Sequence, residues 1–190
     1  MQAAVAVSEG TRINLLEEKI AALESRLAEA EGRLPDDRVT LMIFSGDLDR
    51  VMSSFVIATG AAAMGQQVTM FFTFWGLSVV KKSSEFRDKS FPQTMMALLS
   101  PASSKSLPVS KMNYFGIGAA MLRKMLAKQN VFSLEDMLAL ARELGVRIIA
   151  CEMSREVLGV HESEIMDGVE CGGVATFLAD SLRSRTSLFI

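Results

Sequence analysis

No side chain between Val51 and Val80 is charged, a stretch longer than the ~20 apolar residues that cross a bilayer. Such a run is either a membrane span or part of a well-buried core. Gly65-Gln66-Gln67 divides it into two halves, each shorter than a span. Residues 51–64 are small and helix-like, whereas residues 67–75 are β-branched and aromatic. We therefore predict a helix, a glycine turn and a strand buried on both faces, as in parallel sheets. Peripheral membrane attachment stays open.

The rest of the chain continues this alternation of strands and helices. We expect strands or extended segments at 39–44, 67–74, 146–150, 169–171 and 187–190. Helices are expected at 48–64, 117–128, 134–144, near Ser154 and at 174–184, with an irregular segment over 81–115. Alternation of this kind predicts a parallel sheet covered by helices on both faces. The predicted fold is a doubly wound, flavodoxin-like α/β domain with a five-stranded parallel sheet and an N-terminal amphipathic helix.

That N-terminal helix has a hydrophobic repeat of its own. Apolar residues recur in steps of three and four, at Ile13, Leu16, Ile20, Leu23, Leu27 and Ala30. The spacing predicts an a/d seam of about three heptads, ended by Gly32 and Pro35. The helix either lies on its own domain or forms a short coiled coil joining subunits, which we favour. The predicted organisation is a disordered segment at 1–10, the helix at 11–35 and the α/β domain at 37–190.

Composition excludes several classes of protein. Hydrophobic residues make up 49% of the chain and charged residues only 22%, which argues against low-complexity disorder. Lys and Arg number 20 against 22 Asp and Glu, a net charge of −2, so we expect no nucleic-acid partner. Two cysteines cannot form a secreted disulfide framework, and the N-terminus lacks the basic region of a signal peptide. We expect a cytoplasmic protein.

The motifs for cofactors and metals are incomplete. Gly116-Ile117-Gly118 lacks the third glycine of the dinucleotide fingerprint and does not follow a strand. Ser45-Gly46-Asp47 lies where a flavodoxin holds phosphate, but its carboxylate would repel that anion. His161 is the only histidine, and the two cysteines are twenty residues apart, so a four-ligand zinc site has no support. We expect neither a cofactor nor a metal.

The two cysteines are the most informative residues. Cys151 and Cys171 each end a predicted strand, so both should lie at the ligand-binding edge of the sheet. Neighbouring strands would place them about 4.8 Å apart, and each precedes a helix N-terminus, which favours a thiolate. The alternative is a buried, inert thiol, since free cysteine is often buried. The basic segment 81–111 could form a lid over this edge that attracts an anionic partner, or could be a solvated loop.

Four short motifs carry a resemblance to a known family. They are LMIFSGD at 41–47, FFTFWG at 71–76, CEMS at 151–154 and GGVATFL at 172–178. Over about residues 37–190 the chain resembles the DsrE/DsrF/DrsH-like family of sulfur-transfer proteins, and is similar to its longer members, often labelled DsrE-like or peroxiredoxin-family. The resemblance implies a flavodoxin-like fold, homo-oligomers, and a cysteine after the third strand that carries sulfur as a persulfide. That cysteine corresponds to Cys151, and we interpret Cys171 as a second thiol.

Three functional hypotheses follow. The first is a sulfur carrier or sulfurtransferase in which Cys151 takes sulfane sulfur from a donor protein or small compound and passes it to an acceptor thiol. The second is a thiol peroxidase, which is disfavoured because the threonine of a Thr-x-x-Cys motif is replaced by Ile148. The third is a non-catalytic oligomeric binding or scaffold protein whose thiols are incidental.

Overall fold

The computed structural model describes residues 9–32, 34–86, 89–111, 113 and 116–190. Of the predicted disordered segment 1–10, residues 1–8 lie outside this range. The chain divides into two compact units, Met1–Pro35 and Asp36–Ile190. In the first, the described structure is helix α1, Glu9–Gly32. The second contains all five strands of the sheet.

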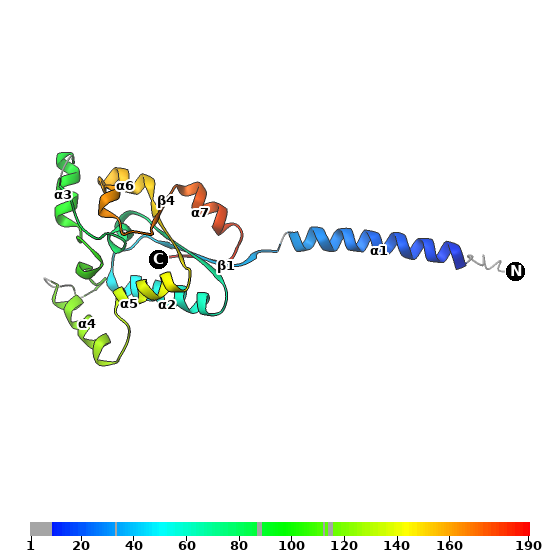
Figure 1. The fold of residues 1–190 in the computed structure, drawn as a ribbon, viewed down its shortest axis with the longest axis horizontal. Helices are drawn as coiled ribbons and strands as arrows, with labels where there is room; N and C mark the ends of the chain where they lie inside the picture. The colour runs from blue at the N-terminus through cyan, green and yellow to red at the C-terminus, as the bar shows by residue number, and fades with distance from the viewer. Residues whose placement is uncertain (1–8, 33, 87–88, 112, 114–115) are drawn as a thin grey trace. The chain divides into compact units, whose positions relative to one another are not determined.

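The second unit is built on a five-stranded sheet (Figure 1). Its strands are β1 Asp36–Ile43, β2 Gln67–Phe72, β3 Arg147–Cys151, β4 Glu170–Gly172 and β5 Ser184–Phe189. All neighbouring strands are parallel, in the order β4-β3-β2-β1-β5. The predicted fold class is thus confirmed. The chain adds strands outward from β1 to β4 and then returns to the other side of β1, an order that differs from the 2-1-3-4-5 of flavodoxin itself.

Helices cover both faces of the sheet. α2 Leu48–Ala63 and α5 Leu134–Glu143 lie on one side, and α6 Glu152–Leu158 and α7 Val174–Ser181 lie on the other (Figure 1). Because successive strand residues point to opposite faces, the core has two parts. The larger includes Leu41, Met70 and Ile148 and is packed by α2 and α5. The smaller contains Cys151.

The uncharged run between residues 51 and 80 is accounted for by α2, a turn at Gly65 and β2. Gly65 has φ +82°, a left-handed conformation that glycine adopts without steric cost. β2 lies in the middle of the sheet, so its side chains are covered on both faces and can be apolar throughout. In the described part of the chain, no helix combines the length and the apolar character that crossing a membrane would require.

Between β2 and α4, two elements differ from the sequence-based expectation. The strand expected to reach residue 74 ends at Phe72, and the chain turns into a 3₁₀ helix, η1 Phe74–Val79. Within the expected irregular segment lies α3, Phe91–Leu99, which begins with a capping box between Ser90 and Gln93. That box, with Pro92 in the first turn, was a readable start signal in the sequence.

The remaining helices connect these elements. They are η2 Ser104–Ser106, α4 Ile117–Lys128 and η3 Glu162–Glu164. Helix α7 ends at Ser181, before the end at residue 184 that the sequence predicts. β5 then begins at Ser184, earlier than the predicted start at residue 187. Ser184 is tied to β1 by a hydroxyl hydrogen bond to Thr40 at 2.8 Å. Pairing with β1 therefore extends the strand further toward its N-terminus than the apolar pattern indicated.

Candidate functional site at the carboxyl edge of the sheet

Cys151 is the last residue of β3 and the N-cap of α6. Cys151 is only 4% exposed. The side chain belongs to a small apolar cluster with Phe71 and Ile149, against which the half-buried Met42 and Phe177 pack. The rings of Phe71 and Phe177 lie 5.5 Å apart between centroids. The thiol is therefore at the edge where parallel sheets bind ligands, but apolar side chains cover it.

Cys171 lies on the neighbouring strand β4 and is exposed. Arg155 of α6 donates a hydrogen bond from Nη1 to its Sγ at 3.0 Å. The register pairs Cys171 with Ala150, and Cys151 with Gly172. Since paired residues share a face and successive residues alternate, the two thiols point to opposite faces of the sheet. Both are free, and this register does not favour a disulfide between them.

Two buried hydroxyl groups hold the first turn of α6 in place. Ser154 and Thr73 are both buried, and their side-chain oxygens are 2.8 Å apart, at hydrogen-bond distance. Thr73 directly follows β2, and the last residue of β2, Phe72, pairs with Ala150. The hydroxyl pair therefore fastens α6 to the end of β2, beside Cys151. Breaking this hydrogen bond would leave a buried hydroxyl without a partner, which costs free energy. The pair therefore fixes the backbone on which Cys151 lies.

A groove at the end of β1 occupies the position expected for a phosphate. Its lining includes Phe44, Ser45, Asp47, Arg50 and Trp75. The Ser45 hydroxyl donates to Asp47 Oδ2 at 2.8 Å, and Arg50 approaches the same carboxylate at 3.7 Å. The polar groups of this loop thus bind one another. Within the described residues, no group of three or more His, Cys, Asp and Glu side chains could hold a metal ion.

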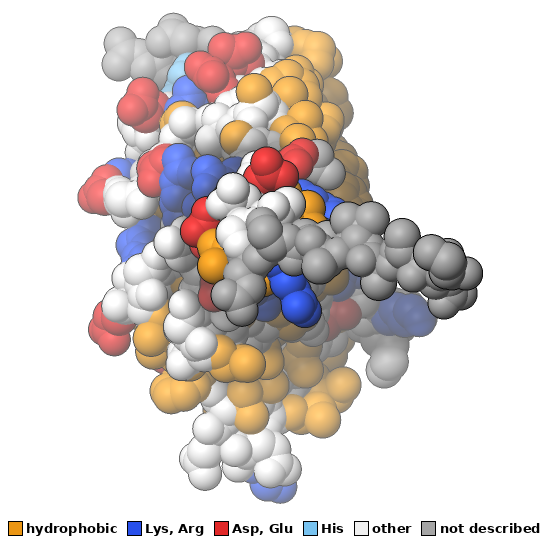
Figure 2. Space-filling model, turned by 90° about the vertical axis from the view of Figure 1, so that its right-hand side faces the viewer, with side chains coloured by type: hydrophobic (Ala, Val, Ile, Leu, Met, Phe, Trp, Pro, Cys, Tyr) orange, Lys and Arg blue, Asp and Glu red, His pale blue; other side chains and the backbone are white. Residues whose placement is uncertain are grey.

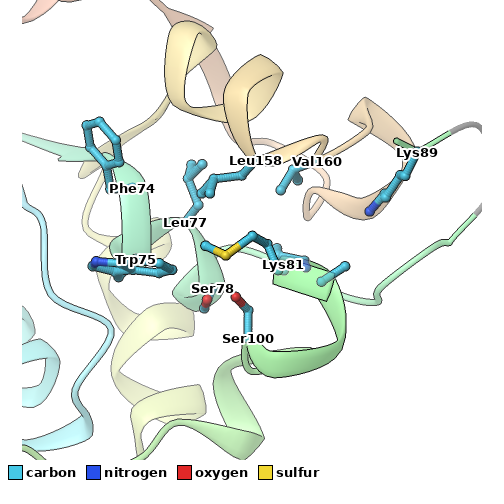
Figure 3. A pocket seen from close by; sticks show the side chains of 11 residues that line it. Phe74, Trp75, Leu77, Ser78, Lys81, Lys89, Ser100, Leu158 and Val160 are labelled. Atoms are coloured by element: carbon cyan, nitrogen blue, oxygen red, sulfur yellow. The ribbon is translucent and has the colours of Figure 1, made fainter. Parts of the chain in front are cut away.

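A second pocket lies between η1, α3 and the end of α6 (Figure 3). Phe74 and Trp75 line it on the η1 side, Leu158 and Val160 on the α6 side, and Lys89 lies at the end far from Phe74 (Figure 3). Phe74 has φ 47°, an uncommon left-handed value for an aromatic residue. The strained turn at Phe74 lets η1 fold across the carboxyl ends of the strands. The pocket is therefore part of the same edge as Cys151.

Beside this pocket lies a buried ion cluster formed by Lys81, Lys89 and Glu164. The Glu164 carboxylate is fully buried; it binds Lys89 Nζ at 2.6 Å and faces Lys81 Nζ at 3.4 Å. Lys81 also donates to Ser84 Oγ at 2.9 Å. These contacts remove Lys81 and Lys89 from the basic lid hypothesised for 81–111, because both point inward to a carboxylate. For the exposed Lys82, Lys105 and Lys111 the lid stays a prediction, and Arg87 and Asp88 lie outside the described residues.

The environment of this cluster shifts two pKa values. Burial alone would raise the pKa of Glu164. Hydrogen bonds from Lys89 and from the backbone of His161 and Glu85, together with the charge of Lys81, lower the pKa by more than burial raises it. The pKa of Glu164 therefore lies below its ordinary value. Burial lowers the pKa of Lys81, and its attraction to Glu164 only partly offsets this. The ionised Glu164 therefore stabilises the fold above the ordinary glutamate pKa of about 4.3, and this stabilisation is lost as the pH falls through the lowered folded-state value.

We predict that Glu164→Gln lowers the free energy of unfolding by about 3–5 kcal/mol, because removing one partner of a buried ion pair leaves buried charge uncompensated. The matched control is Asp167→Asn, which breaks the 3.0 Å pair with Lys82 at a side chain that is 98% exposed. That change should cost less than about 1 kcal/mol. Urea unfolding near pH 7 measures both variants; equal losses in the two would contradict a buried role for Glu164.

Exposed hydrophobic side chains gather on the helices that flank this edge. Figure 2 shows hydrophobic side chains in the upper right and again in the lower part of this face; the upper ones lie at the height where Figure 1 places α6 and α7. On α3, α6 and α7 the exposed large apolar residues are Phe91, Met95, Leu98, Leu99, Met153, Val157, Val174 and Leu178. Exposed apolar side chains that form a contiguous patch mark protein-binding faces, so these helices are candidates for such a face.

Comparison with known proteins identifies the family to which this edge belongs. A sequence profile of the DsrE/DsrF/DrsH-like family matches residues 35–189, nearly all of the second unit. The chain belongs to this family. Among its relatives, Bacillus subtilis strain 168 YrkE is 38% identical over 154 residues, covering 80% of this chain and 96% of YrkE. Sulfur carrier protein DsrE2 of Allochromatium vinosum is 30% identical over 159 residues, covering 80% of this chain and 98% of DsrE2. The crystal structure of E. coli YchN aligns with a TM-score of 0.47 at 11% identity, covering 80% and 98% of the two chains.

Residues beside the thiols of this DsrE-like chain were not singled out from the sequence. They are Arg155 at Cys171, Phe177 over Cys151, and the Thr73–Ser154 hydroxyl pair. Each lies within or next to one of the four motifs of the resemblance, and that position is the sequence signal for these residues. Their roles became visible only when β2, β3, α6 and α7 were placed together.

Proposed function

We propose that this DsrE-like chain is a sulfur carrier that holds sulfane sulfur on Cys151 as a persulfide and passes it to an acceptor thiol. The observation that carries the proposal is the position of Cys151 at the carboxyl end of β3, the edge where open parallel sheets bind ligands. The 30% identical A. vinosum relative, named as a sulfur carrier, supports the same function.

The chemistry needs only thiols. In loading, the Cys151 thiolate attacks the outer sulfur of a donor persulfide R–S–SH; a new S–S bond forms on Cys151, the donor S–S bond breaks and R–S⁻ leaves. In unloading, an acceptor thiolate attacks the outer sulfur and the Cys151 thiolate leaves. The sulfur atom is exchanged between thiols, so the two steps balance without an added oxidant or reductant.

The burial of Cys151 shapes how such a carrier would work. A covered persulfide is shielded from stray thiols in solution, but a donor can reach it only if the cover moves. Phe177 of α7 is half-buried and packs on the cluster that holds the thiol. We assign it as the cover that a donor or acceptor displaces. The exposed apolar side chains nearby on α6 and α7 provide a surface on which a sulfur donor or acceptor protein, or a second copy of this chain, could dock.

Cys171 has a different proposed role. It is exposed, it accepts a hydrogen bond from Arg155, and it points away from Cys151. These features support a separate second thiol at the surface rather than a disulfide partner of Cys151. A cationic neighbour such as Arg155 also suits the binding of an anionic persulfide or donor near this thiol.

The non-catalytic alternative has one observation in its favour, which is the 4% exposure of Cys151. In that case the chain is an oligomeric binding or scaffold protein with incidental thiols, because buried cysteines in apolar surroundings are inert. Thiol peroxidase activity gains no support: Ile148, where a peroxide-orienting threonine would be, is a buried apolar residue.

Mass spectrometry of the intact native protein separates these functions. After incubation with glutathione persulfide and removal of the donor, a carrier should gain about 32 Da per persulfide sulfur. Addition of an acceptor thiol should remove that mass. A chain that stays unmodified, while both thiols react with a maleimide after denaturation, would show that the thiols are incidental and that the scaffold alternative holds.

A further inference from the structure

Within the described residues of the first unit, nothing covers the apolar seam of α1. The five large seam residues, Ile13, Leu16, Ile20, Leu23 and Leu27, are more than half exposed, from 52% at Leu16 to 61% at Leu23. An isolated helix of this length is only marginally stable in water. A surface that binds these side chains would therefore stabilise α1 directly. The question is which partner fits it.

The residue types of the seam favour a two-stranded coil. In the heptad assignment the a positions are Ile13, Ile20 and Leu27, and the d positions are Leu16, Leu23 and Ala30. β-Branched residues at a with leucine at d favour parallel dimers over larger assemblies. Figure 1 draws α1 as one unbroken helix, so the heptads follow one another without a stutter.

The charges that flank the seam are segregated by heptad position. The g positions are all basic, at Arg12, Lys19 and Arg26. The e positions are all acidic, at Glu17, Glu24 and Glu31. In a parallel pair each g residue faces the e residue of the next heptad on the other helix. Every such pair is then oppositely charged.

Other arrangements lose this match. In an antiparallel pair, e faces e and g faces g, so acids would meet acids and bases would meet bases. A shift of one heptad would leave charged pairs at the ends unmatched and would expose part of the seam. From the seam and its flanks together, we propose that two copies of this chain pair through α1 as a parallel, in-register, two-stranded coiled coil.

This pairing has a consequence for the α/β domains. α1 ends at Gly32 and β1 begins at Asp36, so both domains of a parallel pair follow the same end of the coil. The two copies of Cys151 are thereby held within one assembly. The proposal does not depend on the sulfur-transfer function, because it rests on α1 alone.

Disulfide cross-linking of the full-length chain tests the orientation. In a background carrying Cys151→Ser and Cys171→Ser, Leu16→Cys places one thiol at a d position. We expect mild oxidation to link most chains into dimers, seen on a non-reducing gel. The control Ser25→Cys lies at an f position on the outer side of the same helix and should stay largely unlinked. Equal linking of the two variants would overturn the proposal. In an antiparallel pair Leu16 would face Leu27 of the other helix, so linking that occurs only when Leu16→Cys is mixed with Leu27→Cys would overturn it as well.

A charge swap tests the pairing rule with the same Leu16→Cys reporter. Arg12→Glu, Lys19→Glu and Arg26→Glu together make an acidic helix; Glu17→Lys, Glu24→Lys and Glu31→Lys together make a basic one. Each alone should cross-link at least about tenfold less, since every flanking pair becomes repulsive, and a mixture of the two should recover. Cross-linking that is unchanged in both single preparations would contradict the assignment. Contacts between the α/β domains do not change how this experiment is interpreted, because the reporter cysteine lies in α1.

Discussion

A chain carrying Cys151→Ser should pass no sulfur to an acceptor thiol after loading with glutathione persulfide. The substitution keeps the size of the side chain but removes the only nucleophile in the apolar cluster of Phe71, Ile149 and Phe177. Serine carries a hydroxyl in place of the thiol, so it forms no thiolate and cannot hold sulfane sulfur as a persulfide. Intact-mass measurement before and after addition of the acceptor follows both loading and transfer.

Cys171→Ser is the matched control for this loss. Because Cys171 is exposed on the opposite face of the sheet, the variant should still transfer sulfur from Cys151, within about twofold of the native chain. Both variants should unfold at similar denaturant concentrations, so that lost transfer is not a folding defect. Transfer that persists in Cys151→Ser and disappears in Cys171→Ser would move the carrier role to the exposed thiol.

Gly76→Ala should destabilise the α/β domain strongly. A Cβ atom added at Gly76 would lie 2.2 Å from the backbone oxygen of Ile43, which is at the end of β1. The backbone cannot simply move away, because Gly76 N donates to Phe44 O at 2.9 Å and to Thr73 O at 3.0 Å. Forcing extra volume into a packed site costs about 1–3 kcal/mol, and occasionally more. We expect the upper end of that range, measured by urea unfolding.

The matched control is Gly60→Ala on α2. An added Cβ at Gly60 meets nothing within 4 Å, and alanine in a helix interior is favoured over glycine by about 0.5–1 kcal/mol. This variant should therefore be slightly more stable than the native chain. Unchanged stability in Gly76→Ala would show that η1 does not pack rigidly against the end of β1. The result also bears on the site, since η1 crosses the edge where Cys151 lies.

Most of the architecture could be predicted because its signals are local. The apolar run at 67–72, the glycine turn before it and the capped helix beginning at Leu134 each indicate an element within a few residues of sequence. The turn from β2 into η1 could not be predicted in this way. It depends on a close approach between Gly76 and Ile43, which are distant in the sequence and are brought together by the pairing of β1 with β2.

The features of the site also separate into those set by local sequence and those set by contacts between distant segments. The amino-acid sequence by itself determined that Cys151 ends a strand, that α1 carries a heptad seam, and that the chain resembles a sulfur-transfer family; the strand expected to end at Cys171 continues to Gly172. Only the tertiary structure decided which thiol is covered, because that depends on the register of β3 against β4 and on the packing of α7. It also decided that Lys81 and Lys89 turn inward. Their partner Glu164 is 75 residues from Lys89 in the chain and still further from Lys81, and it meets them only when η3 packs beside the end of η1. Exposure and ion pairing depend on contacts between distant segments, whereas strand and helix patterns depend on neighbours in the chain.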